Sequence, residues 1–162
     1  MILIGFGANL PFCGFSPAET LDFAHTAVAR FCEVKARSNN YSSPAWPDPK
    51  DPSYTNGVSL IETDLSPTDL LLALHKVERS FGRDRSKVNA PRTLDLDLLA
   101  YGDLVFDGTD KEGLELPHPR LADRDFVLAP LQEVAPGWKH PVTGKNLEEM
   151  LSSLPERNAV RL

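Results

Sequence analysis

Cysteines and long apolar runs are scarce in this chain of 162 residues. The two cysteines, Cys13 and Cys32, form no disulfide framework, and their spacing matches no zinc site. The longest strongly apolar run, residues 70–74, is far shorter than the ~20 residues that a membrane span needs. No Lys or Arg precedes Arg30, so we expect no signal or transit segment. These absences predict a cytoplasmic protein that makes no contact with a membrane.

An excess of positive charge is also lacking. The chain has 17 Lys and Arg against 23 Asp and Glu, a net charge of −6, which argues against a broad nucleic-acid-binding surface. The hydrophobic fraction of 41% and the charged fraction of 25% are ordinary globular values. A chain of this length buries roughly 70% of its unfolded surface in one core. We therefore expect a single domain over residues 1–162, acting as a monomer with small-molecule partners and no nucleic acid.

Hydrophobic periodicity predicts an α+β protein. Helices are expected from Ser16-Pro17-Ala18-Glu19 to Phe31 and from Ser66-Pro67 to Phe81, where Gly82 ends the second. Strands are expected at Ile2–Ala8, Val34–Tyr41, Asn56–Thr63 and Thr93–Tyr101, a hairpin near Leu104–Leu116, and further helices at Phe126–Val134 and Leu147–Leu154. The order β-α-β-β-α-β predicts a ferredoxin-like antiparallel sheet with helices packed on it and a short C-terminal helical extension.

Two carboxylates lie two residues apart on the last of these strands. Asp95 and Asp97 share one face, whereas Leu94, Leu96, Leu98 and Ala100 occupy the other. Paired carboxylates can bind Mg²⁺ and leave coordination positions for phosphate oxygens. The alternative is that the pair forms the solvent-facing side of an amphipathic strand.

Charge along the chain reverses just before this pair. Residues 76–92 contain six basic and two acidic side chains, and residues 93–125 contain three basic and nine acidic ones. The guanidinium groups of Arg83, Arg85 and Arg92 suit phosphate oxygens, although a charged loop can also be merely solvated. A basic segment that runs into an acidic one is what a metal–polyphosphate site requires.

Two further groups of residues are candidates for contacts with small molecules. The segment 117–120 (Pro-His-Pro-Arg) and Arg124 place His118 among arginines, which favours contact with phosphate. Asn56 can pair with the edge of a heterocycle, and the rings of Tyr54 and Phe126 can stack on one. Both aromatic residues could instead belong to the core.

Six motifs occur in the order expected of one enzyme family: Gly7-Ala8-Asn9-Leu10, Tyr54-Thr55-Asn56, Gly82-Arg83, Ala90-Pro91-Arg92-Thr93-Leu94-Asp95-Leu96-Asp97-Leu98-Leu99, Pro117-His118-Pro119-Arg120 and Arg124-Asp125-Phe126-Val127-Leu128. On these motifs the chain resembles the 6-hydroxymethyl-7,8-dihydropterin pyrophosphokinase family. The resemblance covers residues 2–136, and its most specific part is the P-R-T-L-D-L-D stretch.

The resemblance implies an ATP- and Mg²⁺-dependent diphosphotransferase of folate biosynthesis. It would transfer the β,γ-diphosphoryl group of ATP, the co-substrate, to the hydroxymethyl oxygen of the pterin and release AMP. By the same resemblance, two Mg²⁺ ions would bind Asp95 and Asp97, with Arg83 and Arg92 as catalytic phosphate-binding residues. The implied ATP-binding residues are His75, Glu78, Arg83, Arg85, Arg92, His118 and Arg124. The implied pterin-binding residues are Ser43, Pro44, Trp46, Tyr54, Asn56 and Phe126.

The chain departs from the family pattern in the basic loop. Relatives often have a tryptophan that closes over the pterin, where this chain has Asn89, and the loop is one residue shorter. We expect residues 83–91 to close over the site by charge, with Arg85 taking part.

Two other classes of protein fit parts of the pattern. A two-metal phosphodiesterase or nuclease could use the same aspartates, but it would need a basic track for its substrate. A non-catalytic ferredoxin-like module could bind a small ligand without any paired carboxylates. Pterin-dependent formation of AMP distinguishes the transferase from both.

Overall fold

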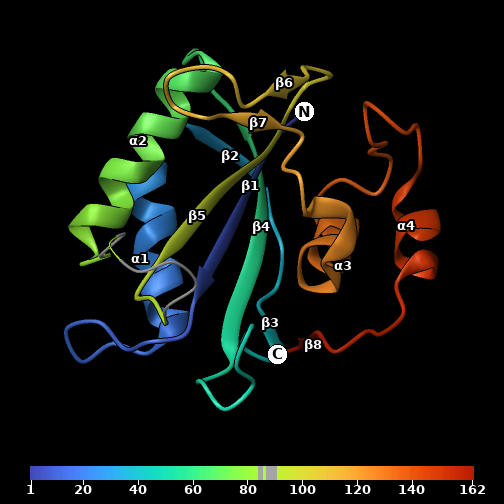
Figure 1. Cartoon of the computed structure of the whole chain (residues 1–162). Coiled ribbons are helices and arrows are strands. Elements are labelled where there is room, and N and C mark those ends of the chain that lie inside the picture. Colours follow the sequence, from blue (N-terminus) through green and yellow to red (C-terminus); the bar gives the residue numbers. More distant parts are fainter. Residues whose placement is uncertain (84–85, 87–90) are drawn as a thin grey trace.

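The computed structural model describes residues 1–83, 86 and 91–162, which form a main sheet with helices on both sides and a separate two-stranded sheet (Figure 1). In chain order they are β1 Ile2–Ala8, α1 Pro17–Val28, β2 Glu33–Arg37, β3 Tyr41–Ser43, β4 Tyr54–Glu62, α2 Pro67–Ser80, β5 Asp95–Tyr101, β6 Phe106–Asp107, β7 Glu115–Leu116, a 3-10 turn Leu121–Asp123, α3 Asp125–Val134, α4 Leu147–Ser153 and β8 Val160–Arg161. Within these described ranges, no helix has both the length and the apolar character to cross a membrane.

The sheet confirms the predicted fold class. Its strand order is β5-β1-β4-β3-β8, with β2 also paired to β4, and every pair is antiparallel. The first strand is therefore central, as the order β-α-β-β-α-β predicts. Helices α1 and α2 cover one face of the sheet, and α3 and α4 lie on the other side (Figure 1).

Helix termini follow local sequence signals. The Ser16 side chain accepts from the Glu19 N–H, and the Glu19 carboxylate accepts from the Ser16 N–H at 2.8 Å, which is the predicted capping box. Helix α2 ends before Gly82, whose φ of 74° is readily adopted only by glycine. Helix α1 ends at Val28, so its predicted extension to Phe31 was wrong. There the Phe31 and Cys32 N–H groups both donate to the Val28 carbonyl, in a turn that leads into β2.

The segment predicted as one strand at Val34–Tyr41 forms two, β2 and β3. Between them the Ser38 hydroxyl accepts from the Val58 N–H at 3.0 Å, so a side chain replaces one backbone group of the ladder. Strand β4 begins at Tyr54 and ends at Glu62, two residues and one residue earlier than expected. The earlier start places Tyr54 opposite Ser43 in the sheet.

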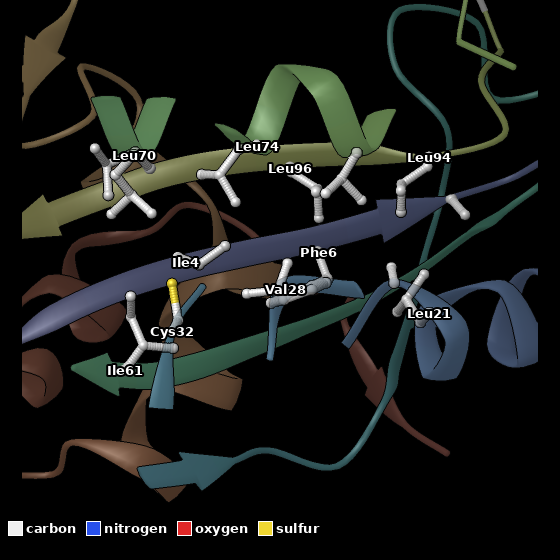
Figure 2. Packing of buried hydrophobic residues seen from close by; sticks show 14 of the residues in the cluster. Ile4, Phe6, Leu21, Val28, Cys32, Ile61, Leu70, Leu74, Leu94 and Leu96 are labelled. Carbon is white, nitrogen blue, oxygen red and sulfur yellow. The ribbon is translucent and has the colours of Figure 1, made fainter. Parts of the chain in front are cut away.

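A closed apolar cluster lies between the sheet and helices α1 and α2 (Figure 2). Strand β1 contributes Ile4 and Phe6, and β5 contributes Leu96 and Leu98. The helices contribute Leu21, Ala24, Val28, Leu70, Leu74 and Val77, all of them buried. The alternation of β1 and β5 points every second residue into this cluster.

The opposite face carries a second cluster under α3 and α4, which includes Leu3, Val58, Leu99 and Ala100. Pairing of β1 with β5 shifts register between Leu3 and Ile4, so β5 has one extra residue there. This irregularity moves Ala100 into the second cluster, whereas strict alternation had placed it with Leu94, Leu96 and Leu98.

Candidate active site

A cleft of about 330 Å³ lies on the α3 side of the sheet, next to the second cluster, whose Leu99 and Val127 also line it. Gly5 and Gly7 of β1 form part of its floor. A Cβ atom on Gly7 would lie 3.2 Å from Asn56 Oδ1, so the missing side chain is what leaves room there. The predicted site residues that line the cleft are Ser43, Pro44, Trp46, Tyr54, Asn56, Arg92, Asp95, Asp97, Arg124 and Phe126.

Positive side chains surround the two carboxylates. Arg83 contacts Asp95 Oδ1, and Arg92 Nη1 lies 2.9 Å from Asp95 Oδ2. Asp97 Oδ2 lies 3.6 Å from Arg124 Nη1 and 3.9 Å from His118 Nε2. Three arginines and a histidine from four parts of the sequence thus meet at one carboxylate pair.

The pKa values of the two carboxyl groups shift in opposite directions. Burial alone would raise the pKa of Asp95, but the guanidinium groups of Arg83 and Arg92 outweigh burial and hold that pKa below its ordinary value. Burial, followed by the negative charge of Asp95, raises the pKa of Asp97 to about 7. Burial and the charges of Arg124 and Arg120 lower the pKa of His118 to about 4, so His118 is neutral at pH 7.

The donor set fits a divalent cation that takes oxygen ligands. Within the described part of the chain no cluster of three or more His, Cys, Asp or Glu side chains could hold a metal ion, so a closed protein cage is absent there. Asp95 and Asp97 instead offer carboxylate oxygens on one face of β5, and both line the cleft. Mg²⁺ typically binds through one or two carboxylates and completes its shell with water and substrate phosphates.

Glu78 lies beneath this group and is fully buried. Its Oε1 atom accepts from Arg83 Nη1 at 2.7 Å and from the Leu96 N–H at 2.8 Å. Glu78 therefore holds both an arginine of the site and the strand segment between the two aspartates. Its predicted contact with ATP, like that of half-buried His75 on α2, stays a prediction, and neither residue lines the cleft.

The recognition residues come from opposite walls of the cleft. On the sheet, Asn56 Nδ2 donates to Ser43 Oγ at 2.8 Å, which fixes the plane of the buried amide. Phe126 comes from α3, and the Arg124 guanidinium lies 5.5 Å from the centre of its ring. Tyr54, the first residue of β4, lines the same cavity. Phe126 also packs against the second apolar cluster, so it borders both the core and the cleft.

The mouth of the cleft carries an exposed tryptophan. Trp46 is 64% exposed, and the Arg120 guanidinium lies 5.8 Å from the centre of its ring. Arg120, Asp123 and Val127 also line the cleft, although the sequence had not marked them as site residues. In the sequence, Arg120 stood out only as an arginine two residues after His118.

Asn9 is a further residue whose contacts the sequence did not reveal. Its Oδ1 atom accepts from the Arg92 N–H at 2.8 Å, and its Nδ2 atom donates to the Pro52 carbonyl at 2.9 Å. This buried amide thus links the end of β1 to the arginine of the site and to the loop that precedes Tyr54. Arg85, Asn89 and most of the proposed lid, residues 84–85 and 87–90, lie outside the described residues.

An antiparallel sheet with a carboxylate pair, several arginines and a pocket for a planar ligand defines a ferredoxin-like α+β protein with a site suited to phosphate chemistry. A model of the family 7,8-dihydro-6-hydroxymethylpterin-pyrophosphokinase matches residues 3–136. The 2-amino-4-hydroxy-6-hydroxymethyldihydropteridine pyrophosphokinase of Pseudomonas aeruginosa is 36% identical over 163 residues, covering 99% of this chain and 96% of that one. Its counterpart from Synechocystis sp. is 36% identical over 157 residues, covering 94% of this chain and 75% of that protein.

A solved structure supports the same fold. The chain matches wild-type Plasmodium falciparum HPPK-DHPS with a TM-score of 0.70 and 12% identity, covering 93% of this chain and 44% of that one. The chain described here therefore spans less than half of that solved chain. It belongs to the 7,8-dihydro-6-hydroxymethylpterin-pyrophosphokinase family.

Proposed function

We propose that this chain transfers diphosphate from ATP to the 6-hydroxymethyl group of 6-hydroxymethyl-7,8-dihydropterin, with release of AMP, in folate biosynthesis. One observation carries the proposal. A single cleft is lined both by the carboxylate pair with Arg92 and Arg124 and by an oriented amide with two aromatic rings. The first group suits a polyphosphate and the second suits a planar heterocycle. A transferase must hold these two substrates in contact with each other.

The phosphate side is assigned to β5 and its neighbours. We assign two Mg²⁺ ions to Asp95 and Asp97, and the bound metal would neutralise charge on the phosphate oxygens of ATP. Arg83 and Arg92, which both contact Asp95 here, would bind phosphate oxygens of ATP beside that carboxylate. Arg124 and neutral His118 would bind further phosphate oxygens from the Asp97 side.

The remaining nucleotide assignments rest on the family resemblance. They are the contacts of His75, Glu78 and Arg85 with ATP. For Glu78, burial beneath Arg83 supports an indirect role through that arginine. The monomeric state and the cytoplasmic location likewise stay predictions.

The pterin side is assigned to β3, β4 and the start of α3. Asn56, held by Ser43, would pair with the edge of the heterocycle, and leaving such a buried edge unpaired is costly. Tyr54 and Phe126, from opposite walls, would contact the two faces of the ring. Pro44 and Trp46 would close the cleft beside it.

The chemistry asked of the protein is mainly positioning. Phosphoryl-group transfer depends on alignment of the two substrates and on neutralisation of charge more than on covalent catalysis. The arginines supply the charge, and the two walls of the cleft fix the distance between the substrates.

The test is a reaction with ATP, Mg²⁺ and 6-hydroxymethyl-7,8-dihydropterin, followed by quantification of AMP. We expect AMP to form only when all three are present, in a 1:1 ratio with the diphosphorylated pterin. Nucleotide hydrolysis without pterin would favour the phosphodiesterase alternative. Binding of both ligands without AMP would favour a non-catalytic module.

A further inference from the structure

The last eight residues, 155–162, form what we call the C-terminal strap, which runs from α4 back to β3 (Figure 1). This segment lies beyond residues 3–136, which match the family model. Its last strand, β8, pairs antiparallel with β3, and the Leu162 N–H donates to the Asn40 carbonyl at 2.9 Å. Val160 and Leu162 are 62% and 67% exposed, so burial of apolar surface does not explain why the strap lies there.

One end of the strap is bound to the start of α3. The Asp125 carboxylate accepts from the Asn158 N–H and, at 2.7 Å, from the Ala159 N–H, both through Oδ2. Asp125 lies between Arg124 and Phe126, which both line the cleft. The strap therefore holds the turn of chain that carries one wall of the site.

The other end of the strap is bound to β3, which leads into the opposite wall. Tyr41 lies opposite Arg161 in this pairing, and the same strand ends at Ser43, which lines the cleft. Glu133, near the end of α3, accepts from the Tyr41 hydroxyl at 2.8 Å and lies 3.4 Å from Arg161 Nε. Helix α3, the strap and β3 thus form a closed ring of contacts beside the cleft.

We propose that the C-terminal strap sets the spacing between α3 and β3, and that Asp125 is the positioning residue that transmits it to Arg124 and Phe126. The proposal rests on the proposed function, because it concerns how the same cleft is held for the pterin. Loosening the ring lets the wall that carries Phe126 move relative to the wall that carries Ser43. Asp95, Arg83 and Arg92 stand outside the ring, and their mutual contacts do not depend on it.

The test compares Asp125→Ala with two matched variants. Asp125→Asn keeps an oxygen acceptor for the two N–H groups, and Asn158→Ala keeps the backbone N–H and removes only the side chain that contacts Glu156. We expect Asp125→Ala to raise the KM for the dihydropterin about tenfold, equivalent to about 1.4 kcal/mol. The KM for ATP should rise less, about threefold, because Arg124 is also held by Asp97 at 3.6 Å, and kcat should stay within about twofold. Asp125→Asn should fall between Asp125→Ala and wild type, and Asn158→Ala should match wild type.

A second measurement tests the ring of contacts between α3, the strap and β3 independently of enzyme activity. Hydrogen exchange should be faster in Asp125→Ala for the amides of Asn158, Ala159 and the first turn of α3, and unchanged in β1 and β5. Calorimetry should show a large loss of affinity for the dihydropterin and a clearly smaller loss for a non-hydrolysable ATP analogue.

Two results would overturn the proposal. One is faster exchange in the ring with an unchanged pterin affinity, which would show a purely structural strap. The other is an equal loss of affinity for both ligands with faster exchange throughout the sheet, which would show general destabilisation. A wild-type protein that forms no AMP would overturn the proposed function instead, while the exchange and binding comparisons would still decide the role of the strap.

Discussion

The two faces of the sheet are built by the same strands and yet differ in chemistry. On the face covered by α1 and α2, strands β1 and β5 present Ile4, Phe6, Leu96 and Leu98 to a closed apolar cluster. On the face toward α3, the same stretch of β1 presents glycines and β5 presents the carboxylate pair, so that a cleft remains. Alternate residues of one strand thus serve stability on one side and, as we propose, catalysis on the other.

The comparison also explains why the cleft can be polar without weakening the core. The site occupies only one end of its face, and the rest of that face is filled by a second apolar cluster under α3 and α4. Buried charge at the cleft is compensated, since Asp95 is paired with Arg83 and Arg92. Substitutions on the two faces should therefore separate activity from stability.

The largest expected effect is loss of activity in Asp97→Ala. Removing one carboxylate of the proposed metal pair should lower kcat by about 1000-fold or more, several kcal/mol of transition-state stabilisation. The fold should persist, because this side chain faces the cleft. Steady-state AMP formation and circular dichroism measure the two properties. Asp103→Ala, in the exposed turn after β5, is the control. Near-normal kcat in Asp97→Ala would remove Asp97 from the site.

A smaller effect, on stability rather than on activity, is expected at Leu96, one residue before Asp97. Leu96 is 1% exposed on the closed face, so Leu96→Ala should lower the free energy of unfolding by about 3 kcal/mol. Its backbone N–H still donates to Glu78, so kcat should stay within about threefold well below the melting temperature. Urea denaturation compares it with Leu72→Ala, which alters an exposed side chain of α2. A loss of kcat well beyond threefold, with a nearly unchanged free energy of unfolding, would contradict the division between the two faces of the sheet.

The closed face should also be sensitive to acid through His25. Its Nδ1–H donates to the Leu21 carbonyl, its Nε2 lies 2.9 Å from Ser59 Oγ, and the ring stacks on Phe6. Burial, aided by the charge of Arg37 and opposed by the Leu21 contact and the charge of Asp22, lowers the pKa of His25 to about 4. In the unfolded chain the pKa of His25 lies near its ordinary value of 6.5, so the unfolded state binds this proton first as pH falls.

Stability should therefore decrease as pH falls from about 6.5 to 4, with His25 contributing a loss of about 3 kcal/mol at the lower end. Urea denaturation across this range would measure it for wild type and His25→Gln, and the difference between the two profiles isolates His25 from the carboxylates. Parallel profiles would show that His25 is not the group responsible.

The smallest effect concerns the glycine residues of β1 that form part of the floor of the cleft. Gly7→Ala places a Cβ atom 3.2 Å from Asn56 Oδ1 and should weaken binding of the dihydropterin about tenfold, with ATP affected less. Gly5→Ala is the matched change, because the atoms nearest to its Cβ belong to the flexible Leu99 side chain, at 3.4 Å or more. Calorimetry with each ligand measures both variants, and equal pterin affinities for the two would show that the floor at Gly7 is not the pterin pocket.

Local signals in the sequence were sufficient for most of the framework. Capping at Ser16 and Ser66, the glycine after α2 and the alternation of residues 94–98 each depend on a few neighbouring residues, and the structure has all of them. The motif-bearing residues Asp95, Asn56 and Phe126 were also placed in one cleft, as the resemblance implied.

Contacts between distant segments could not be predicted in the same way. The extra residue in β5, the Ser38 contact that divides β2 from β3, and the pairing of β8 with β3 depend on partners tens of residues away. The contact between Glu78 and the Leu96 N–H, 18 residues apart, is of the same kind, since periodicity only placed Glu78 on a helix face. None of these has a local sequence signature.

The most direct test of the central claim is a methyl NMR titration of the wild-type protein with Mg²⁺, a non-hydrolysable ATP analogue and 6-hydroxymethyl-7,8-dihydropterin. The two faces supply their own reporters, because Leu99 and Val127 line the cleft, whereas Leu21 and Leu70 lie in the closed cluster. We predict large shifts for the methyl groups of Leu99 and Val127 and small ones for those of Leu21 and Leu70. Shifts that are largest at Leu21 and Leu70 would contradict the assignment of substrate binding to the glycine-bearing face.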